Sequence, residues 1–255
     1  MVNKKIKNYG YTSYRWLSNL LDPSHLIHSI SGYIKYIKDM RHYSKMDGAE
    51  EIKFTDTYPC LHDNISSTPF EAHYFYQDLW TFKKIYDTKV KHHIDVGSNI
   101  GLISFLTTIT KVTFIDIRPL IAQLKNFESK EGSILSMPYE DDSVKSISSL
   151  HVAEHIGLGR YGDPLDPDGT KKAALELQRV LAPGGNLFFS LPIGKPRLMF
   201  NAHRIHSTTQ ILDYFSDLKL VELSGIDDEG NFIENIKPEY LDSCDYGCGL
   251  FWFKK

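Results

Sequence analysis

Hydrophobic positions follow two different spacings along this chain, and the spacing changes near residue 90. Before that point, apolar residues recur three or four positions apart in "WLSNLL", "HLIHSISGYIKYIKDM" and "FEAHYFYQDLWTFKKIY". This spacing predicts amphipathic helices. We therefore expect residues 1–88 to form a helical segment whose apolar stripes pack against a partner surface.

From residue 91 onward, short apolar runs alternate with helical patterns. The strand-like runs are "HHIDV", "KVTFID", a short one near residue 131, "VKSISSL", "NLFFSLP", "LKLVELSGI" and "CGLFWF". Helices are expected from about residue 101, across "GTKKAALELQRVL" and near residues 208–216. Such alternation predicts an α/β fold, with a mostly parallel sheet and helices on both of its faces.

Composition narrows the class of protein. With 255 residues, 42% of them hydrophobic, the chain can form one main domain and an accessory segment. A net charge of −3 gives no general attraction to nucleic acid, so we expect no nucleic-acid partner. Three cysteines favour a reducing compartment over a disulfide framework. Neither a signal peptide nor a transmembrane segment is indicated, and we expect a cytoplasmic protein.

The stretch "KHHIDVGSNIGLISFL" combines an acid with two glycines where the first strand ends. Gly97 and Gly101 let the backbone approach a ligand that the following helix N-terminus faces. The glycines do not have the dinucleotide spacing, because Asn99 and Leu102 occupy the second and third positions of that fingerprint. A nicotinamide oxidoreductase is therefore disfavoured. Asp95 would repel pyrophosphate and attract an ammonium group.

Asp116 ends the second strand, 21 residues after Asp95, where an acid can accept both hydroxyls of a ribose. A ligand with a cationic amino-acid end and a ribose is S-adenosylmethionine. Two stretches then follow in order, "EGSILSMPYEDDSVKSISSLHVAEHIG" and "ALELQRVLAPGGNLFFSLP". With them, the sequence resembles the class I S-adenosylmethionine-dependent methyltransferases through residue 191. The resemblance implies a Rossmann-like domain over residues 89–255, with residues 1–88 as a helical cap and substrate lid.

Further stretches, "FEAHYFYQDLW", "GRYGDPLDPDGT", "FNAHRIHS" and "YGCGLFWFKK", are similar to a methyltransferase-like family of undefined activity from bacterial surface-polysaccharide gene clusters. The cofactor-binding residues that these resemblances imply are Asp95, Gly97, Ser98, Gly101, Asp116, Ile117, Ser133 and Ile134. Two positions depart from the methyltransferase pattern. Asn99 replaces the middle glycine, and Ser133 replaces an acid that would accept from the adenine amino group, which weakens that contact.

The reacting groups are expected after the fourth strand. If "HVAEH" begins a helical turn, His151 and His155 share one face with Glu154 beside them, and "NAHRIHS" brings His203 to the same rim. Two mechanisms remain open. A histidine, His155 or His203, acts as general base for a hydroxyl, with Glu154 nearby. Alternatively, a divalent ion of iron, manganese or zinc activates the hydroxyl. Its ligands would be His151, Glu154, His155 and His203.

The expected substrate is a sugar or a nucleotide-linked sugar, methylated on a hydroxyl for capsule or O-antigen biosynthesis. Its expected binding residues are Arg160, Tyr161, Asp163 and Arg204. The arginines suit a phosphate, whereas Asp163 either binds saccharide hydroxyls or forms a turn. The alternative function is a non-catalytic ligand-binding partner of a polysaccharide assembly. Cys244 and Cys248 have no matching pair, so a packed final strand is favoured over a zinc site.

Overall fold

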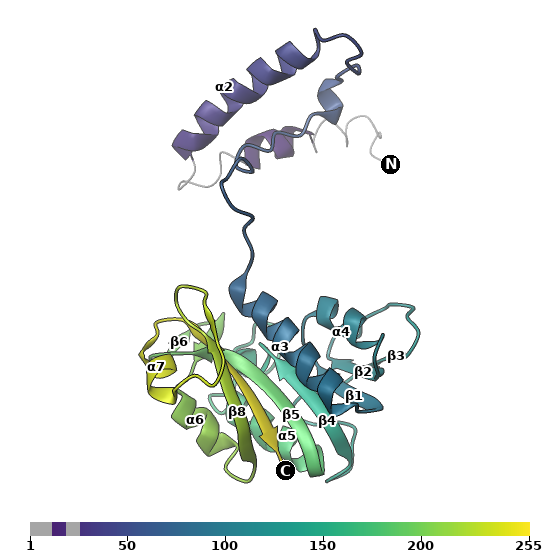
Figure 1. The fold of residues 1–255 in the computed structure, drawn as a ribbon, viewed down its shortest axis with the longest axis vertical. Helices are drawn as coiled ribbons and strands as arrows, with labels where there is room; N and C mark the ends of the chain where they lie inside the picture. The colour runs from purple at the N-terminus through teal and green to yellow at the C-terminus, as the bar shows by residue number, and fades with distance from the viewer. Residues whose placement is uncertain (1–11, 19–25) are drawn as a thin grey trace. The chain divides into compact units, whose positions relative to one another are not determined.

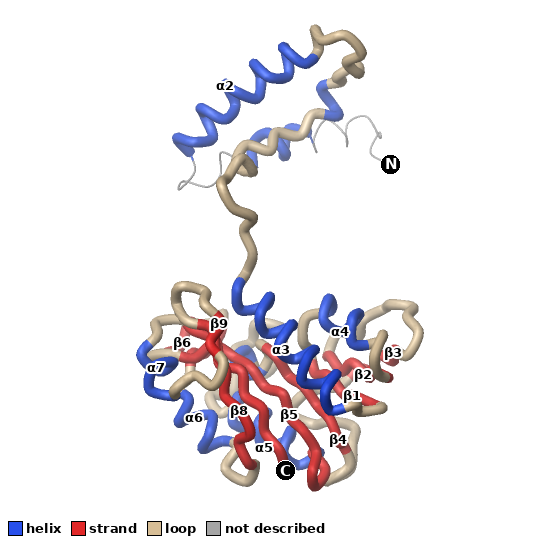
Figure 2. The backbone as a smooth tube through the Cα atoms, viewed as in Figure 1, coloured by secondary structure: helices blue, strands red, loops and turns tan. Residues whose placement is uncertain are grey.

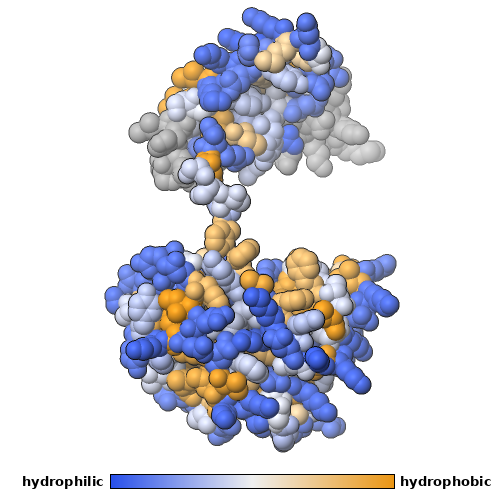
Figure 3. Space-filling view, in the orientation of Figure 1, coloured by the Kyte–Doolittle hydropathy of each residue, from blue (hydrophilic) through white to orange (hydrophobic). Residues whose placement is uncertain are grey.

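The computed structural model describes residues 12–18 and 26–255, which fall into two compact units, residues 1–69 and residues 70–255 (Figure 1). Polar side chains cover much of the visible surface of each unit, with apolar patches between them (Figure 3). Among the described helices, none has the length and apolar character that crossing a membrane requires.

The first unit is organised around one tryptophan. It contains a helical stretch at residues 12–18, helix α2 (Leu26–Tyr43) and a short 3-10 helix, η2 (Phe54–Asp56). The Trp16 ring stacks on Tyr33 of α2 with 5.4 Å between ring centroids, and its Nε1 donates to Thr57 Oγ1 at 2.9 Å. α2 confirms the helix predicted in "HLIHSISGYIKYIKDM", except for residue 25. That residue and residues 19–21 of "WLSNLL" lie outside the described residues.

The second unit contains an eight-stranded sheet in the order β3-β2-β1-β4-β5-β10-β8-β9. The strands are β1 (His92–Val96), β2 (Lys111–Asp116), β3 (Phe127–Glu131), β4 (Val144–Leu150), β5 (Leu181–Ile193), β8 (Lys219–Ile226), β9 (Phe232–Ile233) and β10 (Gly247–Lys254). β1 to β5 pair in parallel, whereas β10 is antiparallel to both β5 and β8. The mostly parallel sheet is as predicted. A separate antiparallel hairpin of β6 (Arg197–Met199) and β7 (His203–Ile205) was not predicted.

Helices cover both faces of the sheet, and each face has its own core (Figure 2). α3 (Ala72–Thr88) and α4 (Ile100–Leu106) contribute Trp80 and Ile103 to one core. α5 (Gly169–Val180), α6 (Thr208–Tyr214) and α7 (Pro238–Ser243) contribute to the other. Successive strand residues point to opposite faces, so Phe188 of β5 joins the first core and Phe189 the second.

Helix α3 belongs to the second unit, although the sequence analysis grouped it with the N-terminal segment. Trp80 Nε1 donates to Glu222 Oε1 at 2.8 Å, and Ile85 is 1% exposed in the core of that unit. The compact unit therefore begins at residue 70 and not at residue 89. The lid function assigned to the N-terminal segment stays a prediction.

Candidate active site

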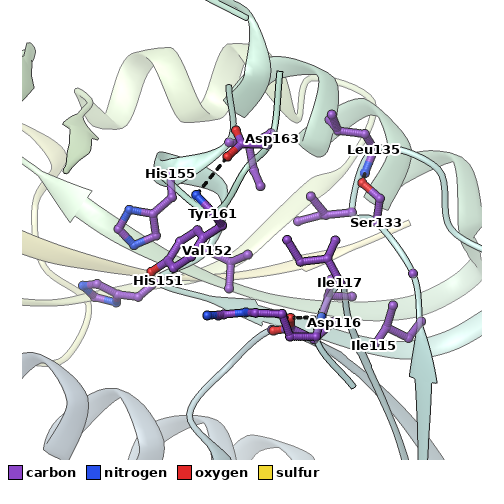
Figure 4. Close-up of a pocket in the computed structure, with 16 residues that line it drawn as sticks. Ile115, Asp116, Ile117, Ser133, Leu135, His151, Val152, His155, Tyr161 and Asp163 are labelled. Carbon is purple, nitrogen blue, oxygen red and sulfur yellow. Dashed lines mark hydrogen bonds and ion pairs between the residues drawn. The ribbon is translucent and has the colours of Figure 1, made fainter. Parts of the chain in front are cut away.

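The carboxyl ends of β1, β2 and β4 border a cleft made of two adjoining cavities (Figure 4). The first cavity has a volume of about 120 Å³ and is bordered mainly by the residues that follow β1, β2 and β3. The second has a volume of about 530 Å³ and contains the polar groups after β4. Four residues line both cavities: Gly97, His151, His155 and Tyr161. The two cavities therefore form one site with two compartments.

The turn after β1 places its backbone on both cavities. Gly97 has a φ of 70°, and a Cβ there would lie 3.2 Å from Val152 Cγ2. This combination of positive φ and close packing requires glycine. Gly101 differs, because it lies in the first turn of α4 and lines a separate groove between α3 and α4. The structure thus places the expected cofactor residue Gly97 on the cleft, but not Gly101.

Asn99, which replaces the middle glycine of the expected motif, begins the helix. Its Oδ1 accepts a hydrogen bond from the Gly101 backbone at 2.9 Å, and its Nδ2 donates to Asp78 Oδ2 at 2.7 Å. Asn99 also lines the second cavity. The departure from the motif is therefore a helix cap that ties α4 to α3.

Asp95 has a different position from the one expected. Its side chain is fully buried, accepts hydrogen bonds from Ser148 Oγ and the Ser98 backbone, and lines neither cavity. Burial raises the pKa of this carboxyl to about 6 despite those hydrogen bonds. In this geometry Asp95 stabilises the turn from its buried side and does not contact a ligand directly. Ser98, which it positions, lines the second cavity.

Asp116 and its neighbours line the first cavity. Asp116 ends β2 and its Oδ1 accepts a hydrogen bond from the Arg118 backbone at 2.7 Å. Ile117 and Ser133 line the same cavity (Figure 4). Ile134 lines it too. The other apolar residues that line it are Val96, Ile115, Leu135, Val152 and Ile156. A carboxylate at a strand end beside apolar walls suits a ribose attached to a flat base.

Tyr161 borders both cavities and lies between two guanidinium groups. Arg118 is 4.6 Å and Arg160 is 5.2 Å from its ring centroid. Cation–π contacts of this kind orient an aromatic ring. Arg160 also donates to the Ala202 carbonyl at 3.1 Å and lines the second cavity. Both residues are therefore placed where a substrate could contact them.

The segment "HVAEH" is not an α-helical turn. His151 follows β4 with a φ of 55°, and a 3-10 helix, η3, spans Ala153–His155. His151 Nδ1 donates to Gln77 Oε1 at 2.6 Å, whereas His155 Nδ1 donates to the Ala202 carbonyl at 2.6 Å. The two histidines thus have different partners and do not share a helix face, which corrects the expected arrangement.

Glu154 is the most unusual residue of the second cavity. Its side chain is fully buried, and neither oxygen has a hydrogen-bond partner in the described part of the chain. Oε1 lies 3.7 Å from His155 Nε2. Burial raises the pKa of Glu154 to about 8 and lowers that of His155 to about 4. Near neutral pH, the second cavity therefore contains a carboxylic acid beside a neutral imidazole.

His203, at the start of β7, also lines the second cavity, with its ring centroid 6.3 Å from that of His155. Its Nε2 is buried without a partner among residues 12–18 and 26–255. The predicted metal ligands His151, Glu154, His155 and His203 are not the group that comes closest together. Three ligand atoms lie within 4.8 Å of one another in a different group, formed by His73, His151 and Cys248.

Two predicted substrate residues shape a loop instead. Arg204 donates to the carbonyls of Ile156 at 2.6 Å and Asp166 at 2.8 Å, and it lines neither cavity. Asp163 borders the first cavity, but its Oδ2 accepts from the Gly157 backbone at 2.5 Å. The guanidinium of Arg204 is therefore not available to a substrate phosphate in this geometry.

Sequence analysis missed two aromatic residues on the second cavity. Tyr74 comes from the first turn of α3, and Tyr246 comes from the segment before β10. The Tyr246 ring lies 5.3 Å from that of His203. The two tyrosines are distant in sequence, and no local pattern distinguishes them from core aromatics.

Comparisons with known proteins agree with this architecture. A family model described as "Caenorhabditis protein of unknown function, DUF268" matches residues 123–234, and no curated protein matches the chain. The YcgJ protein of Bacillus subtilis is similar over 71% of this chain and 98% of its own, with 14% identity and a TM-score of 0.51. A candidate sarcosine dimethylglycine methyltransferase from Galdieria sulphuraria covers 71% and 86%, with 17% identity and a TM-score of 0.51.

A third structure, the (4+2)-cyclase SpnF, covers 71% of this chain and 81% of its own, with 13% identity and a TM-score of 0.50. The second unit thus has the Rossmann-like fold of class I methyltransferases. Because a cyclase shares this fold, the fold alone does not decide the reaction.

Proposed function

We propose that this protein transfers a methyl group from S-adenosylmethionine to a hydroxyl of a sugar or nucleotide-linked sugar. The observation that carries the proposal is the junction of the two cavities. Asp116 and apolar walls lie in the first cavity, Glu154 lies in the second, and His155 lines both. A ligand that extends through the shared wall would bring its reactive end to the acid–imidazole pair.

The residues of the first cavity fit this cofactor. The Asp116 carboxylate, whose side chain is 17% exposed, can accept both ribose hydroxyls, and Ile117 can pack on the adenine. Ser98 and the turn at Gly97 can contact the amino-acid end. When bound, the cofactor supplies a methyl group on a positively charged sulfur.

His155 is the proposed general base. Its Nδ1 proton is held by the Ala202 carbonyl, so the free lone pair is on Nε2, which lies 3.7 Å from Glu154 Oε1. A nearby cation favours the ionised form of Glu154. With the cofactor bound, Nε2 of His155 would accept the proton of the substrate hydroxyl as that oxygen takes the methyl group, and S-adenosylhomocysteine would leave as the second product. The Glu154 carboxylate stabilises the imidazolium, and the pair accepts the proton as a unit.

The structure favours a base over a metal held by His151, Glu154, His155 and His203. His151 Nδ1 is engaged by Gln77, and the tight cluster that includes His151 contains none of the other three. A metal at those four ligands would require their side chains to move closer together, because the described residues do not bring these four ligands into one cluster. The metal mechanism therefore requires more movement of side chains than the base mechanism does.

The proposal of a saccharide substrate is based on the polar lining of the second cavity and on the resemblance to a surface-polysaccharide family. Arg160 can bind a phosphate of a nucleotide-linked sugar, and Glu154 and Tyr246 can hydrogen-bond hydroxyls. We place the reaction in the cytoplasm and in the synthesis of capsule or O-antigen. The competing proposal is a non-catalytic partner that only binds these ligands.

Mass spectrometry tests the proposal. The full chain is incubated with S-adenosylmethionine and a panel of nucleotide sugars. We expect one substrate to gain one methylene mass, with one equivalent of S-adenosylhomocysteine formed. A non-catalytic partner would bind both ligands without forming S-adenosylhomocysteine. An N-methylated or carboxyl-methylated product would refute the hydroxyl specificity.

A further inference from the structure

Three potential metal ligands converge next to the active-site cleft from distant parts of the sequence. His73 lies in the first turns of α3, His151 follows β4, and Cys248 lies at the start of β10. One ligand atom from each lies within 4.8 Å of the other two. His73 and Cys248 are buried and His151 is half-buried.

The hydrogen bonds of His151 leave one ring nitrogen buried and without a hydrogen-bond partner in the described residues. Its Nδ1 donates to Gln77 Oε1 at 2.6 Å, and Ser190 Oγ donates to the same oxygen. The lone pair is therefore on Nε2, which is buried and has no hydrogen-bond partner in the described residues. A buried lone pair without a partner costs free energy. In metal sites the second ring nitrogen of a ligating histidine is fixed in the way Gln77 fixes this one.

The other two side chains have matching chemistry. The His73 ring stacks on Tyr246 with 5.2 Å between centroids, and one of its ring nitrogens belongs to the group of ligand atoms. Burial lowers the pKa of His73, so its imidazole is neutral. Cys248 is a free thiol whose pKa is raised by burial, so without a metal it stays protonated. Two imidazoles and one sulfur suit zinc better than calcium or magnesium.

We propose that His73, His151 and Cys248 bind one divalent ion of the zinc class. In a tetrahedral site with Zn–N and Zn–S bonds of about 2.0–2.3 Å, ligand atoms lie about 3.3–3.8 Å apart, so a small inward movement of side chains completes the site. Three protein ligands leave a fourth position for water or another molecule. Binding releases the thiol proton, because the ligand is the thiolate.

The ion would fix the wall that the two cavities share, because His151 lines both of them. It would also join α3 and β10 to the end of β4. This site is distinct from the Glu154–His155 pair. It goes beyond the proposed methyl transfer and does not depend on it.

Cobalt binding tests this site with a readout that is independent of catalysis. The full chain is stripped with a chelator and titrated with Co²⁺, whose thiolate complexes absorb in the near ultraviolet. We expect one ion per chain and a thiolate band that Zn²⁺ displaces. Cys60→Ser combined with Cys244→Ser should keep this band, because neither thiol belongs to the group. Cys248→Ser should lose it and bind at least about tenfold more weakly.

A second variant keeps the test decisive if Cys248→Ser does not fold. His73→Asn retains the thiol but removes one ligand, and we expect at least about tenfold weaker cobalt binding. His206→Asn is the matched control, since this histidine is also buried with an unpartnered nitrogen in the described chain but lies outside the group. Unchanged affinity in His73→Asn, an unchanged band in Cys248→Ser, or no stoichiometric binding by the wild type would overturn the proposal. Titration with S-adenosylhomocysteine in parallel reports separately on the methyltransferase site.

Discussion

Nε2 of His155 lies 3.7 Å from Oε1 of Glu154, and both residues line the second cavity. Because Nδ1 of the same imidazole donates to the Ala202 carbonyl, Nε2 is the atom that can receive a proton. Glu154 is buried, and neither of its oxygens has a hydrogen-bond partner in the described chain, so its carboxyl group can ionise in response to a positive charge on that imidazole. This relationship identifies a pair, and not a single histidine, as the candidate base.

Replacing His155 by asparagine tests the base. The asparagine amide can still donate to the Ala202 carbonyl, but it removes the lone pair of Nε2. We expect the rate of methyl transfer to fall by about 10²–10⁴, with the affinity for the cofactor unchanged. His92→Asn, at an exposed histidine on β1 that lines neither cavity, should keep wild-type activity. Full activity of His155→Asn would exclude this residue as the base.

The buried Glu154 should make stability depend on pH. Its pKa is 4.5 in the unfolded reference and about 8 in the folded protein. The folded state therefore binds more protons between these values, and its stability falls as pH rises through that interval. Relative to Glu154→Gln, the wild type should lose on the order of a few kcal/mol between about pH 5 and 8.5.

Urea denaturation of the ligand-free, chelator-treated proteins measures this difference. Glu239→Gln, at an exposed glutamate of α7, is the control and should follow the wild type. If the wild type and Glu154→Gln give parallel stability curves, Glu154 is not buried in its uncharged form.

Gly97 and Gly184 separate backbone strain from packing at the cleft. Both have positive φ, 70° and 74°, but only a Cβ at Gly97 has a close neighbour, Val152, at 3.2 Å. Gly184→Ala should cost about 1–2 kcal/mol in stability and leave cofactor affinity unchanged. Gly97→Ala should cost more and also weaken cofactor binding. Val152→Ala in the Gly97→Ala protein should recover part of the loss, and a failure to do so would remove packing as the cause.

Truncation tests which segment α3 belongs to. Removing residues 1–69 should leave a cooperatively folding protein that still binds the cofactor. Removing residues 1–88 should abolish both properties, because it deletes Trp80 and Ile85 from the core. It also deletes Gln77 and Asp78, the hydrogen-bond partners of His151 and Asn99. Thermal unfolding followed by circular dichroism distinguishes the two results. A cooperative transition after the longer deletion would contradict the assignment.

Much of the sheet could be predicted from sequence because its strands are short apolar runs between clear helical patterns. The hairpin β6–β7 could not, since Arg197–Met199 are all exposed and have no apolar alternation. The unit to which α3 belongs also could not be predicted, because the apolar stripe of an amphipathic helix does not identify the surface that it packs against.

The positions of Asp116 and Gly97 on the cleft could be predicted, because each follows from a place at a strand end. Their roles toward a cofactor stay predictions. The site was not predictable where long-range contacts decide. Arg204 is engaged by carbonyls of a loop some 40 residues away in sequence, at separations of 48 and 38 residues. Cys248 belongs to no paired-cysteine motif of the kind that indicates a zinc site. Its closeness to two histidines follows from the pairing of β10 with β5.

Calorimetric titration of the full chain with S-adenosylhomocysteine tests the central claim, that the first cavity is a cofactor site, most directly. The account predicts saturable binding at one site per chain. Asp116→Ala should weaken binding by roughly 1–3 kcal/mol, because two ribose hydroxyls lose their charged acceptor. Asp213→Ala, on α6 and lining neither cavity, should bind as the wild type does. No binding by the wild type, or unchanged affinity in a folded Asp116→Ala protein, would contradict the account.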